Sequence, residues 1–152
     1  MSTVSTRKPR FNHVAMSLPP DLLDPANRDE IVRFYREVFG WEEIPQMTID
    51  RQRLVLSAYT YEQFVFLIAD EPPMECPRLD HFGISVQTEA ELDDMLARAT
   101  AFREHDDRVD IVDKKVDDYE MLAITSFYVR YRLPMMVEVQ WWDFKGHGPD
   151  GR

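Results

Sequence analysis

The sequence contains little cysteine, and it has no long apolar segment. Its single cysteine, Cys76, cannot form an internal disulfide, which fits a reducing compartment. No apolar run approaches the length of a membrane span. The first ten residues carry charge but lack the apolar core of a signal peptide. We therefore expect a cytoplasmic protein.

Basic residues are also scarce relative to acidic ones. The chain has 18 Lys and Arg against 28 Asp and Glu, a formal net charge of −10. Nucleic acids and anionic membranes require a basic face, so this balance argues against both as partners. A small molecule bound in a local pocket remains possible, because a pocket can differ in charge from the surface around it.

Apolar and aromatic residues are present in ordinary amounts. The 152 residues are 44% hydrophobic and 12% aromatic, which is typical of a globular protein rather than a disordered one. This length is sufficient for one domain with a full core, or for two small modules that share a core.

One sequence pattern occurs twice, at residues 12–18 and again at residues 80–86. Each copy alternates as a short strand does, with apolar residues on one face and small or polar residues on the other. His13 and His81 start the polar face of their respective copies. A single histidine on a strand is usually structural, but two at equivalent positions of a repeat suggest a shared role.

The segments that follow the two strands are also similar. Each copy continues with an apolar stripe at helical spacing and then with three strand-like segments. We predict helices that start at Asn27 and Thr88, and the first is expected to end at Gly40. The strands are predicted at 43–49, 52–59, 63–69, 109–116, 121–132 and 135–142, with a tight turn at 133–134.

The sequence therefore predicts an α+β protein built from two βαβββ modules. We expect the first module at residues 11–72 and the second at 80–144, joined by a linker at 73–79. Residues 1–10 and 145–152 are expected to be flexible tails. His105 and His147 are expected in a polar loop and in the second tail, as solvated residues.

A carboxylate lies in the middle of the predicted last strand. Alternation along residues 136–142 places Glu138 on the same face as Gln140, between buried valines. Burial of an unpaired carboxylate is costly, so Glu138 requires a cation. The sequence offers three sources: Arg130, Arg132, or a bound metal ion.

A metal ion would draw on the two repeated histidines as well. His13, His81 and Glu138 form the two-imidazole, one-carboxylate ligand set of non-haem Fe(II) oxygenases, which leaves open positions for a substrate. The same ligands accept Zn²⁺, Mn²⁺, Ni²⁺ or Co²⁺.

The duplicated βαβββ order, with a histidine on the first strand of each half and a glutamate on the last strand, resembles the vicinal-oxygen-chelate superfamily. That group includes glyoxalase I, extradiol dioxygenases, an epimerase, and fosfomycin- and bleomycin-resistance proteins. The resemblance covers residues 11–144. It implies an eight-stranded, half-open barrel around one divalent metal, with Fe(II) favoured, and a homodimer. Phe66 stands where glyoxalase I has a further ligand, so the pattern here has three ligands.

The resemblance implies a metal-dependent enzyme that acts on a small, apolar or aromatic substrate with adjacent oxygens. An extradiol-type dioxygenase, an oxidoreductase, is the leading interpretation. The alternatives are a metal-free binding protein of the bleomycin-resistance type, and a lyase or transferase of the glyoxalase or fosfomycin-resistance type. Tyr128 is the candidate catalytic acid, with a packed structural tyrosine as the other interpretation. The candidate substrate-binding residues are Phe64, Phe66, Arg130, Gln140 and Trp142. Core packing is the alternative for the three aromatic residues, and for Arg130 the alternative is a solvated side chain or a partner for surface acids.

Overall fold

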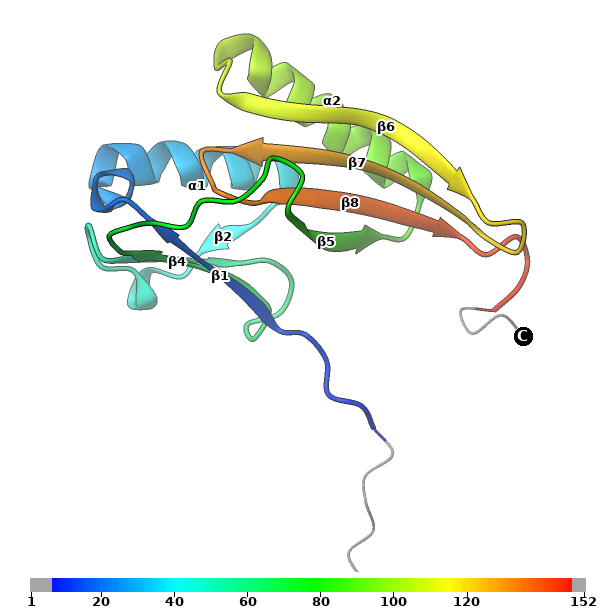
Figure 1. The fold of residues 1–152 in the computed structure, drawn as a ribbon, viewed down its shortest axis with the longest axis horizontal. Coiled ribbons are helices and arrows are strands. Elements are labelled where there is room, and N and C mark those ends of the chain that lie inside the picture. The colour runs from blue at the N-terminus through cyan, green and yellow to red at the C-terminus, as the bar shows by residue number, and fades with distance from the viewer. Residues whose placement is uncertain (1–6, 149–152) are drawn as a thin grey trace, which may run out of the picture.

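The computed structural model describes residues 7–148 and consists of two helices and eight strands (Figure 1). No helix in this range is long and apolar enough to cross a membrane. The elements in chain order are β1 (His13–Leu18), a 3₁₀ helix η1 (Pro20–Leu23), α1 (Pro25–Phe39), β2 (Glu42–Glu43), a 3₁₀ helix η2 (Pro45–Met47), β3 (Arg53–Ser57), β4 (Phe64–Ala69), β5 (His81–Val86), α2 (Glu89–His105), β6 (Val109–Asp118), β7 (Ala123–Tyr131) and β8 (Met136–Asp143).

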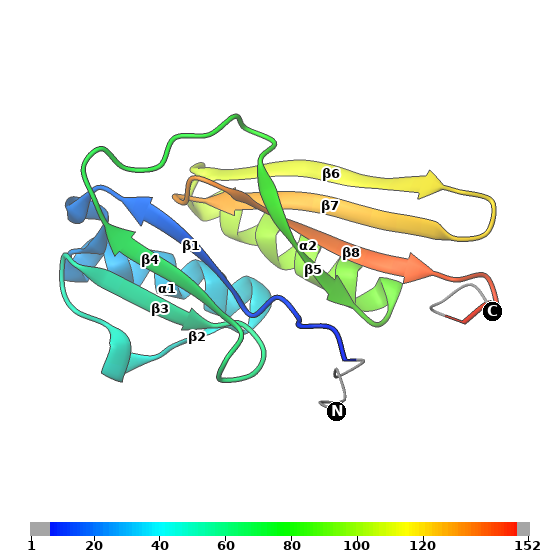
Figure 2. The same cartoon turned by 60° about the horizontal axis from the view of Figure 1, so that its bottom comes forward.

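The strands form two four-stranded sheets with the same topology. Their orders are β1-β4-β3-β2 and β5-β8-β7-β6. In each sheet the first strand pairs in parallel with the last, and the other pairs are antiparallel. The predicted α+β class and the repeated βαβββ modules are confirmed. The two sheets lie next to each other and do not close into a barrel (Figure 2).

The register of the parallel pairs is equivalent in the two modules. Ala15 lies opposite Phe66 in the first sheet, and Gly83 lies opposite Glu138 in the second. Phe66 therefore occupies the position in the first module that Glu138 has in the second, as the sequence predicts.

The first helix begins earlier than predicted. Its N-cap is Asp24, whose side chain accepts a hydrogen bond from the backbone N–H of Asn27 at 2.9 Å, and Pro25 is its first residue. The prediction of a start at Asn27 was wrong, because proline fits the first helical position, where no N–H is needed. The end was predicted correctly: Gly40 has φ +72°, a left-handed conformation that glycine adopts without a side-chain clash.

The second helix begins at the predicted capping box. The Thr88 hydroxyl accepts from the backbone N–H of Glu91, and the Glu91 carboxylate accepts from the backbone N–H of Thr88. The helix continues to His105, so the prediction of a loop there was wrong. His105 is nevertheless exposed, as expected of a solvated residue.

The second strand of the first module is much shorter than predicted. β2 is only Glu42–Glu43, whereas the sequence predicts a strand over 43–49, and within the rest of that range Ile49 forms an isolated bridge with Arg53 of β3. Pro45 begins a 3₁₀ helix directly afterwards. Proline has no N–H to donate to a neighbouring strand, so the pairing stops there.

A single hydrophobic core joins the two modules. Residues of both helices and both sheets belong to it, and α1 packs against α2. The buried Tyr35 hydroxyl donates to the Tyr131 carbonyl at 3.1 Å and accepts from the Tyr131 N–H at 3.3 Å. Phe34 and Phe102 pack edge to face in the same core, with ring centroids 5.0 Å apart. The modules thus meet through their helix-covered sides, and this leaves the opposite faces of the sheets open.

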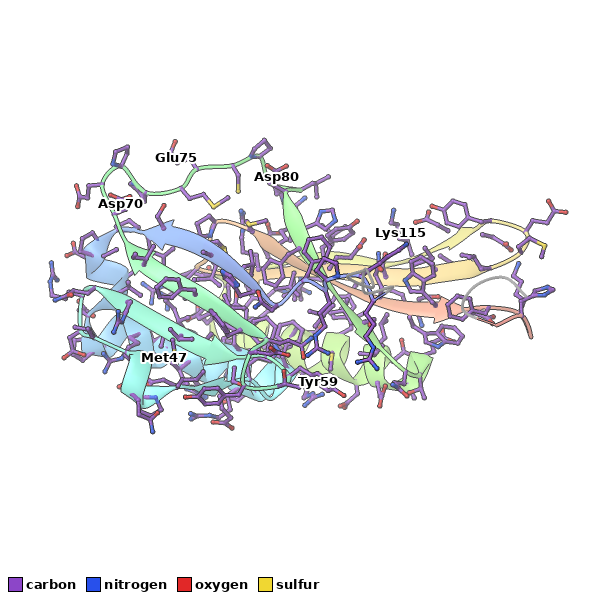
Figure 3. All side chains as sticks on the ribbon, turned by 90° about the horizontal axis from the view of Figure 1, so that it is seen from below. Met47, Tyr59, Asp70, Glu75, Asp80 and Lys115 are labelled. Carbon is purple, nitrogen blue, oxygen red and sulfur yellow. The ribbon has the colours of Figure 1, made fainter. Side chains whose placement is uncertain are left out.

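The segment between β4 and β5 runs along one margin of the molecule, where Figure 3 labels Asp70, Glu75 and Asp80. The Met74 N–H donates to the Ser17 hydroxyl at 2.7 Å, and the Cys76 thiol donates to the Pro134 carbonyl at 3.1 Å. These contacts tie the segment to both modules. The predicted tails extend into residues 1–6 and 149–152, which lie outside the described part of the chain.

Candidate metal and substrate site

The open face of the second sheet brings together His81 and Glu138. β5 and β8 are neighbouring parallel strands in which His81 lies opposite Met136 and Gly83 lies opposite Glu138, so Glu138 stands two residues along β8 from the position opposite His81. The Nε2 atom of His81 is 3.9 Å from the Oε1 atom of Glu138. Glu138 is only 7% exposed, whereas His81 is open to solvent. A buried carboxylate therefore faces an accessible imidazole.

Two further side chains contact the Glu138 carboxylate. The Gln140 amide donates to Oε1, and the Tyr128 phenol forms a hydrogen bond with the same carboxylate. The hydrogen bond to Glu138, together with partial burial, raises the pKa of Tyr128 to about 12. Its ring packs edge to face against His81, with centroids 5.0 Å apart. Tyr128 is therefore a neutral hydrogen-bond donor at physiological pH.

The two arginines considered as partners for Glu138 lie elsewhere. Arg130 donates to the Pro134 carbonyl at 3.1 Å and lies 3.4 Å from Asp110. Arg132 binds Glu30 and Asn27. The basic group that the structure places at Glu138 is His81, which leaves a metal ion as the remaining cation source.

Both repeated histidines are held in a similar way. The Nδ1 atom of His81 lies 2.8 Å from the Leu79 carbonyl oxygen, and the Nδ1 atom of His13 lies 2.6 Å from the Asn12 amide oxygen. Because an oxygen of this kind accepts, each Nδ1 must carry the proton. In the neutral imidazole this tautomer leaves Nε2 as the nitrogen that can bind a metal, the usual arrangement around a metal-binding histidine.

The structure does not bring His13 to the other two predicted ligands. β1 and β5 point in roughly opposite directions (Figures 1 and 2), and each begins with its histidine. His13 is exposed and stacks on Phe64, with ring centroids 4.8 Å apart. Within residues 7–148 of one chain, no group of three or more His, Cys, Asp or Glu side chains is arranged to hold a metal ion.

The residues of the second sheet nevertheless fit part of a metal site. Glu138 is buried without a contact to Arg130 or Arg132, and the Nε2 atom of His81 lies 3.9 Å from its Oε1 atom. A carboxylate oxygen and an imidazole nitrogen are suitable donors for the metals considered above. One chain thus provides two adjacent donors, and the third predicted donor lies on its other module.

The predicted substrate-binding aromatics divide between the modules. Phe64 and Phe66 lie on β4 and are partly buried, whereas Trp142 lies on β8 and is 39% exposed. Sequence reasoning missed Phe144, whose ring centroid is 5.9 Å from that of Trp142. It also missed the oxygens that orient the histidines, those of Asn12 directly before His13 and of Leu79 two residues before His81, although this closeness in sequence was an available signal.

The fold is similar to those of several solved proteins. A lactoylglutathione lyase from Agrobacterium tumefaciens matches with a TM-score of 0.60 and 19% identity, over 88% of this chain and 94% of that chain. The fosfomycin resistance protein FosX from Mesorhizobium loti matches with 0.57 and 12%, over 89% and 92%. A glyoxalase/bleomycin resistance protein/dioxygenase family enzyme from Burkholderia phytofirmans matches with 0.59 and 14%, over 85% and 95%.

The resemblance derived from the sequence is thereby confirmed at the level of fold. The chain has the fold of the vicinal-oxygen-chelate superfamily. No family model matches the sequence, and no curated protein matches it significantly. The activity must therefore be argued from the site itself, since one fold supports many reactions.

Proposed function

We propose that the protein is a metal-dependent enzyme that binds one divalent metal, with Fe(II) favoured, through His81, Glu138 and His13. Its substrate would be a small, apolar or aromatic molecule with two adjacent oxygens, and the closest reaction class is extradiol-type dioxygenation. The observation that carries this proposal is the buried Glu138, whose carboxylate lies beside the Nε2 atom of His81 and contacts neither candidate arginine. When bound, the metal would act as a Lewis acid and as a template for the two oxygens.

The surrounding residues support this chemistry. The neutral Tyr128 phenol lies beside both His81 and Glu138, where its single O–H could turn from Glu138 to donate a hydrogen bond to a substrate oxygen. Gln140 holds one Glu138 oxygen and thereby fixes the orientation of the carboxylate. Arg130 is already engaged with Asp110 and a carbonyl, which argues against its role as a substrate-carboxylate anchor.

A second copy of the chain is the proposed source of the third ligand. His13 is exposed on the open face of the first sheet, and the modules of one chain meet through the other side. If the first sheet of one copy faces the second sheet of another, His13 and Phe64 approach His81 and Glu138 together. The expected homodimer would then be needed for a complete site.

The proposal predicts the metal content of the purified protein and its variants. Protein prepared without chelators, and again after anaerobic loading with Fe(II), Mn²⁺, Zn²⁺, Ni²⁺ or Co²⁺, is analysed for metal per chain. We expect about one metal per chain. Loss of a residue that only supports a metal ligand usually lowers metal affinity by roughly 10–100-fold. His81→Ala and Glu138→Gln change proposed ligands themselves, so their metal affinity should fall by more than that.

The matched control is His105→Ala, which removes an exposed histidine at the end of α2 and should leave the metal content unchanged. Oxygen uptake with catechols then tests the dioxygenase reaction. Absence of metal in folded protein after every loading would contradict the enzyme proposal and favour a metal-free binding protein.

A further inference from the structure

The segment that precedes β1 presents an aromatic side chain to solvent. Phe11 is 99% exposed, and on the loop between β3 and β4 the side chains of Tyr59 and Tyr61 are also exposed. The Arg10 guanidinium forms an ion pair with the Glu62 carboxylate, which holds this loop beside the segment. Three exposed aromatic side chains therefore lie on two adjoining segments, at the end of the first sheet where β1 begins. Exposed apolar residues that lie together often mark an interaction surface.

The backbone next to Phe11 continues the path of β1. The Phe64 N–H donates to the Asn12 carbonyl at 3.0 Å, which extends the parallel contact of β1 with β4 by one residue. In an extended chain, side chains two residues apart point to the same side. Phe11 consequently lies on the same side as His13, toward the open face of the first sheet.

The short distance between Phe11 and His13 determines where the Phe11 ring lies in a dimer. A strand rises about 3.3 Å per residue, so the Cα atoms of these two residues are about 7 Å apart. In the proposed site, His13 of one copy lies at the His81 and Glu138 of a second copy. Phe11 of the first copy then faces the second sheet of that copy too, at whatever angle the two sheets cross.

The second sheet has room for an aromatic ring next to Glu138. Gly83 lies opposite Glu138, and alternation along β5 places it on the same face as His81. Both Gly83 and His81 are exposed. A Cβ atom added at Gly83 would meet only the Glu138 carbonyl oxygen, at 3.9 Å. The surface over Gly83 is therefore open in a single chain and can accept a side chain from outside.

Charge favours a second copy of this chain as the partner of the segment. Residues 7–10 include three basic residues and no acidic residue. The second module, residues 80–144, has 15 acidic residues against 7 basic ones. A basic segment is attracted to an acidic surface and is repelled by a basic one. One chain thus carries both halves of a complementary pair, and a two-fold dimer makes the contact twice.

We propose that Phe11 of one copy packs over Gly83 on the second sheet of another copy and covers the candidate site there. This inference rests on the proposed function, and it names the contact through which the two copies meet. Phe11 is then a positioning residue, because it holds His13 of its own chain at the site of the second copy. Burial of its ring removes apolar surface from water and stabilises the dimer.

A cross-link tests this contact separately from metal binding. Phe11→Cys and Gly83→Cys are introduced together into the full chain, and Cys76→Ser removes the native thiol. A short bifunctional maleimide is added with and without Zn²⁺, and the products are identified on a denaturing gel and by peptide mapping. We expect a covalent dimer in which position 11 of one chain is joined to position 83 of the other. Phe11→Cys with Ala101→Cys, an exposed position on α2, is the matched control and should give no such link.

Truncation of the ring tests its contribution to the dimer. By analytical ultracentrifugation, Phe11→Ala should raise the dissociation constant of the dimer at least roughly tenfold, whereas Phe11→Leu, which stays apolar, should raise it less. Val116→Ala removes another exposed apolar side chain and is the control, because Val116 pairs with Thr125 on the core-facing side of β7. Zinc content of Phe11→Ala should be native at concentrations where it is dimeric and fall on dilution, since its ligands are intact. Near-ultraviolet circular dichroism confirms that each variant is folded.

The outcomes distinguish this inference from the proposed function. A native dimer that binds zinc but gives no link between positions 11 and 83, or one whose dissociation is unchanged in Phe11→Ala, would overturn the inference and leave the metal site intact. Cross-linked dimers that bind no metal after any loading would overturn the metal chemistry and support the contact. Protein that remains monomeric at every concentration, with and without Zn²⁺, would overturn both the contact and the sharing of ligands between copies.

Discussion

At the scale of single residues, the main feature is a carboxylate that the fold buries beside an imidazole. Glu138 can be buried because Tyr128 and Gln140 form hydrogen bonds with it. The same contacts fix its direction toward His81. Removal of either contact would leave the carboxylate less restrained, so these neighbours matter to the proposed metal site as much as the proposed ligands do.

A different carboxylate, Asp106, gives a prediction about the pH dependence of stability. It accepts hydrogen bonds from Arg108 and, at 2.6 Å, from the Tyr131 phenol. Arg108, the main cause, holds the pKa of Asp106 well below its ordinary value of 3.8. Because the folded-state pKa is lower than the unfolded one, this contribution to stability is complete above about pH 4 and is lost as the pH falls further.

We therefore expect Asp106→Asn to lower the free energy of unfolding by about 1–2 kcal/mol at pH 7, with a smaller penalty below pH 4. Urea unfolding across this pH range measures the effect. Asp107→Asn, an exposed neighbour in the same turn, is the control. A penalty in Asp106→Asn that stays constant down to pH 2 would contradict the assignment.

At the scale of elements, short local signals determine where each helix begins and ends. The Thr88 capping box satisfies backbone N–H groups that the first turn of α2 cannot pair internally. β5 ends at Val86, so this cap also fixes the connection between the strand that carries His81 and the helix that covers it. The position of the site thus depends partly on a helix cap.

Thr88→Ala should therefore destabilise the protein by about 1 kcal/mol, because the backbone N–H of Glu91 loses its acceptor. Thermal or urea unfolding measures the change, and Thr88→Ser, which keeps the hydroxyl, should be close to the native protein. If alanine were tolerated as well as serine, the capping interaction would make no net contribution.

At the scale of the whole molecule, the packing of the modules determines where the open faces lie. The contact of α1 with α2 and the hydrogen bonds between Tyr35 and Tyr131 hold the modules together on one side. His13 and His81 consequently lie on different open faces of one chain. In the proposed three-ligand site, the third ligand would come from a second chain, and this leads to a test that a single-chain site would fail.

Mixing His13→Ala with Glu138→Gln provides that test. Each variant alone should have no intact three-ligand site, but a mixed dimer has one site with a native His13 from one copy and a native His81 and Glu138 from the other. We expect metal binding to reappear on unfolding and refolding the two variants together, at up to about a quarter of the native level for random pairing of equal amounts. No recovery in mixed dimers whose formation is confirmed would indicate that the ligands come from a single chain.

The sequence alone was sufficient for the local and periodic features. Alternation along the strands predicted which faces are open, the capping box at Thr88 predicted the start of α2, and the repeat predicted the register that aligns Phe66 with Glu138. These features depend on residues close in the chain or on a repeated pattern. The prediction failed at residues 43–49, where Pro45 ends the strand pairing.

The tertiary structure alone decided which of the predicted site residues meet. Nothing local in the sequence shows whether Arg130 or Arg132 pairs with Glu138. In the fold, Arg130 contacts Asp110 and Arg132 contacts Glu30. Nor does the repeat reveal that His13 and His81 lie on separate faces, because this follows from how two modules pack through their helices. Sequence patterns record which face a side chain occupies, whereas the distance between two faces is set by long-range packing.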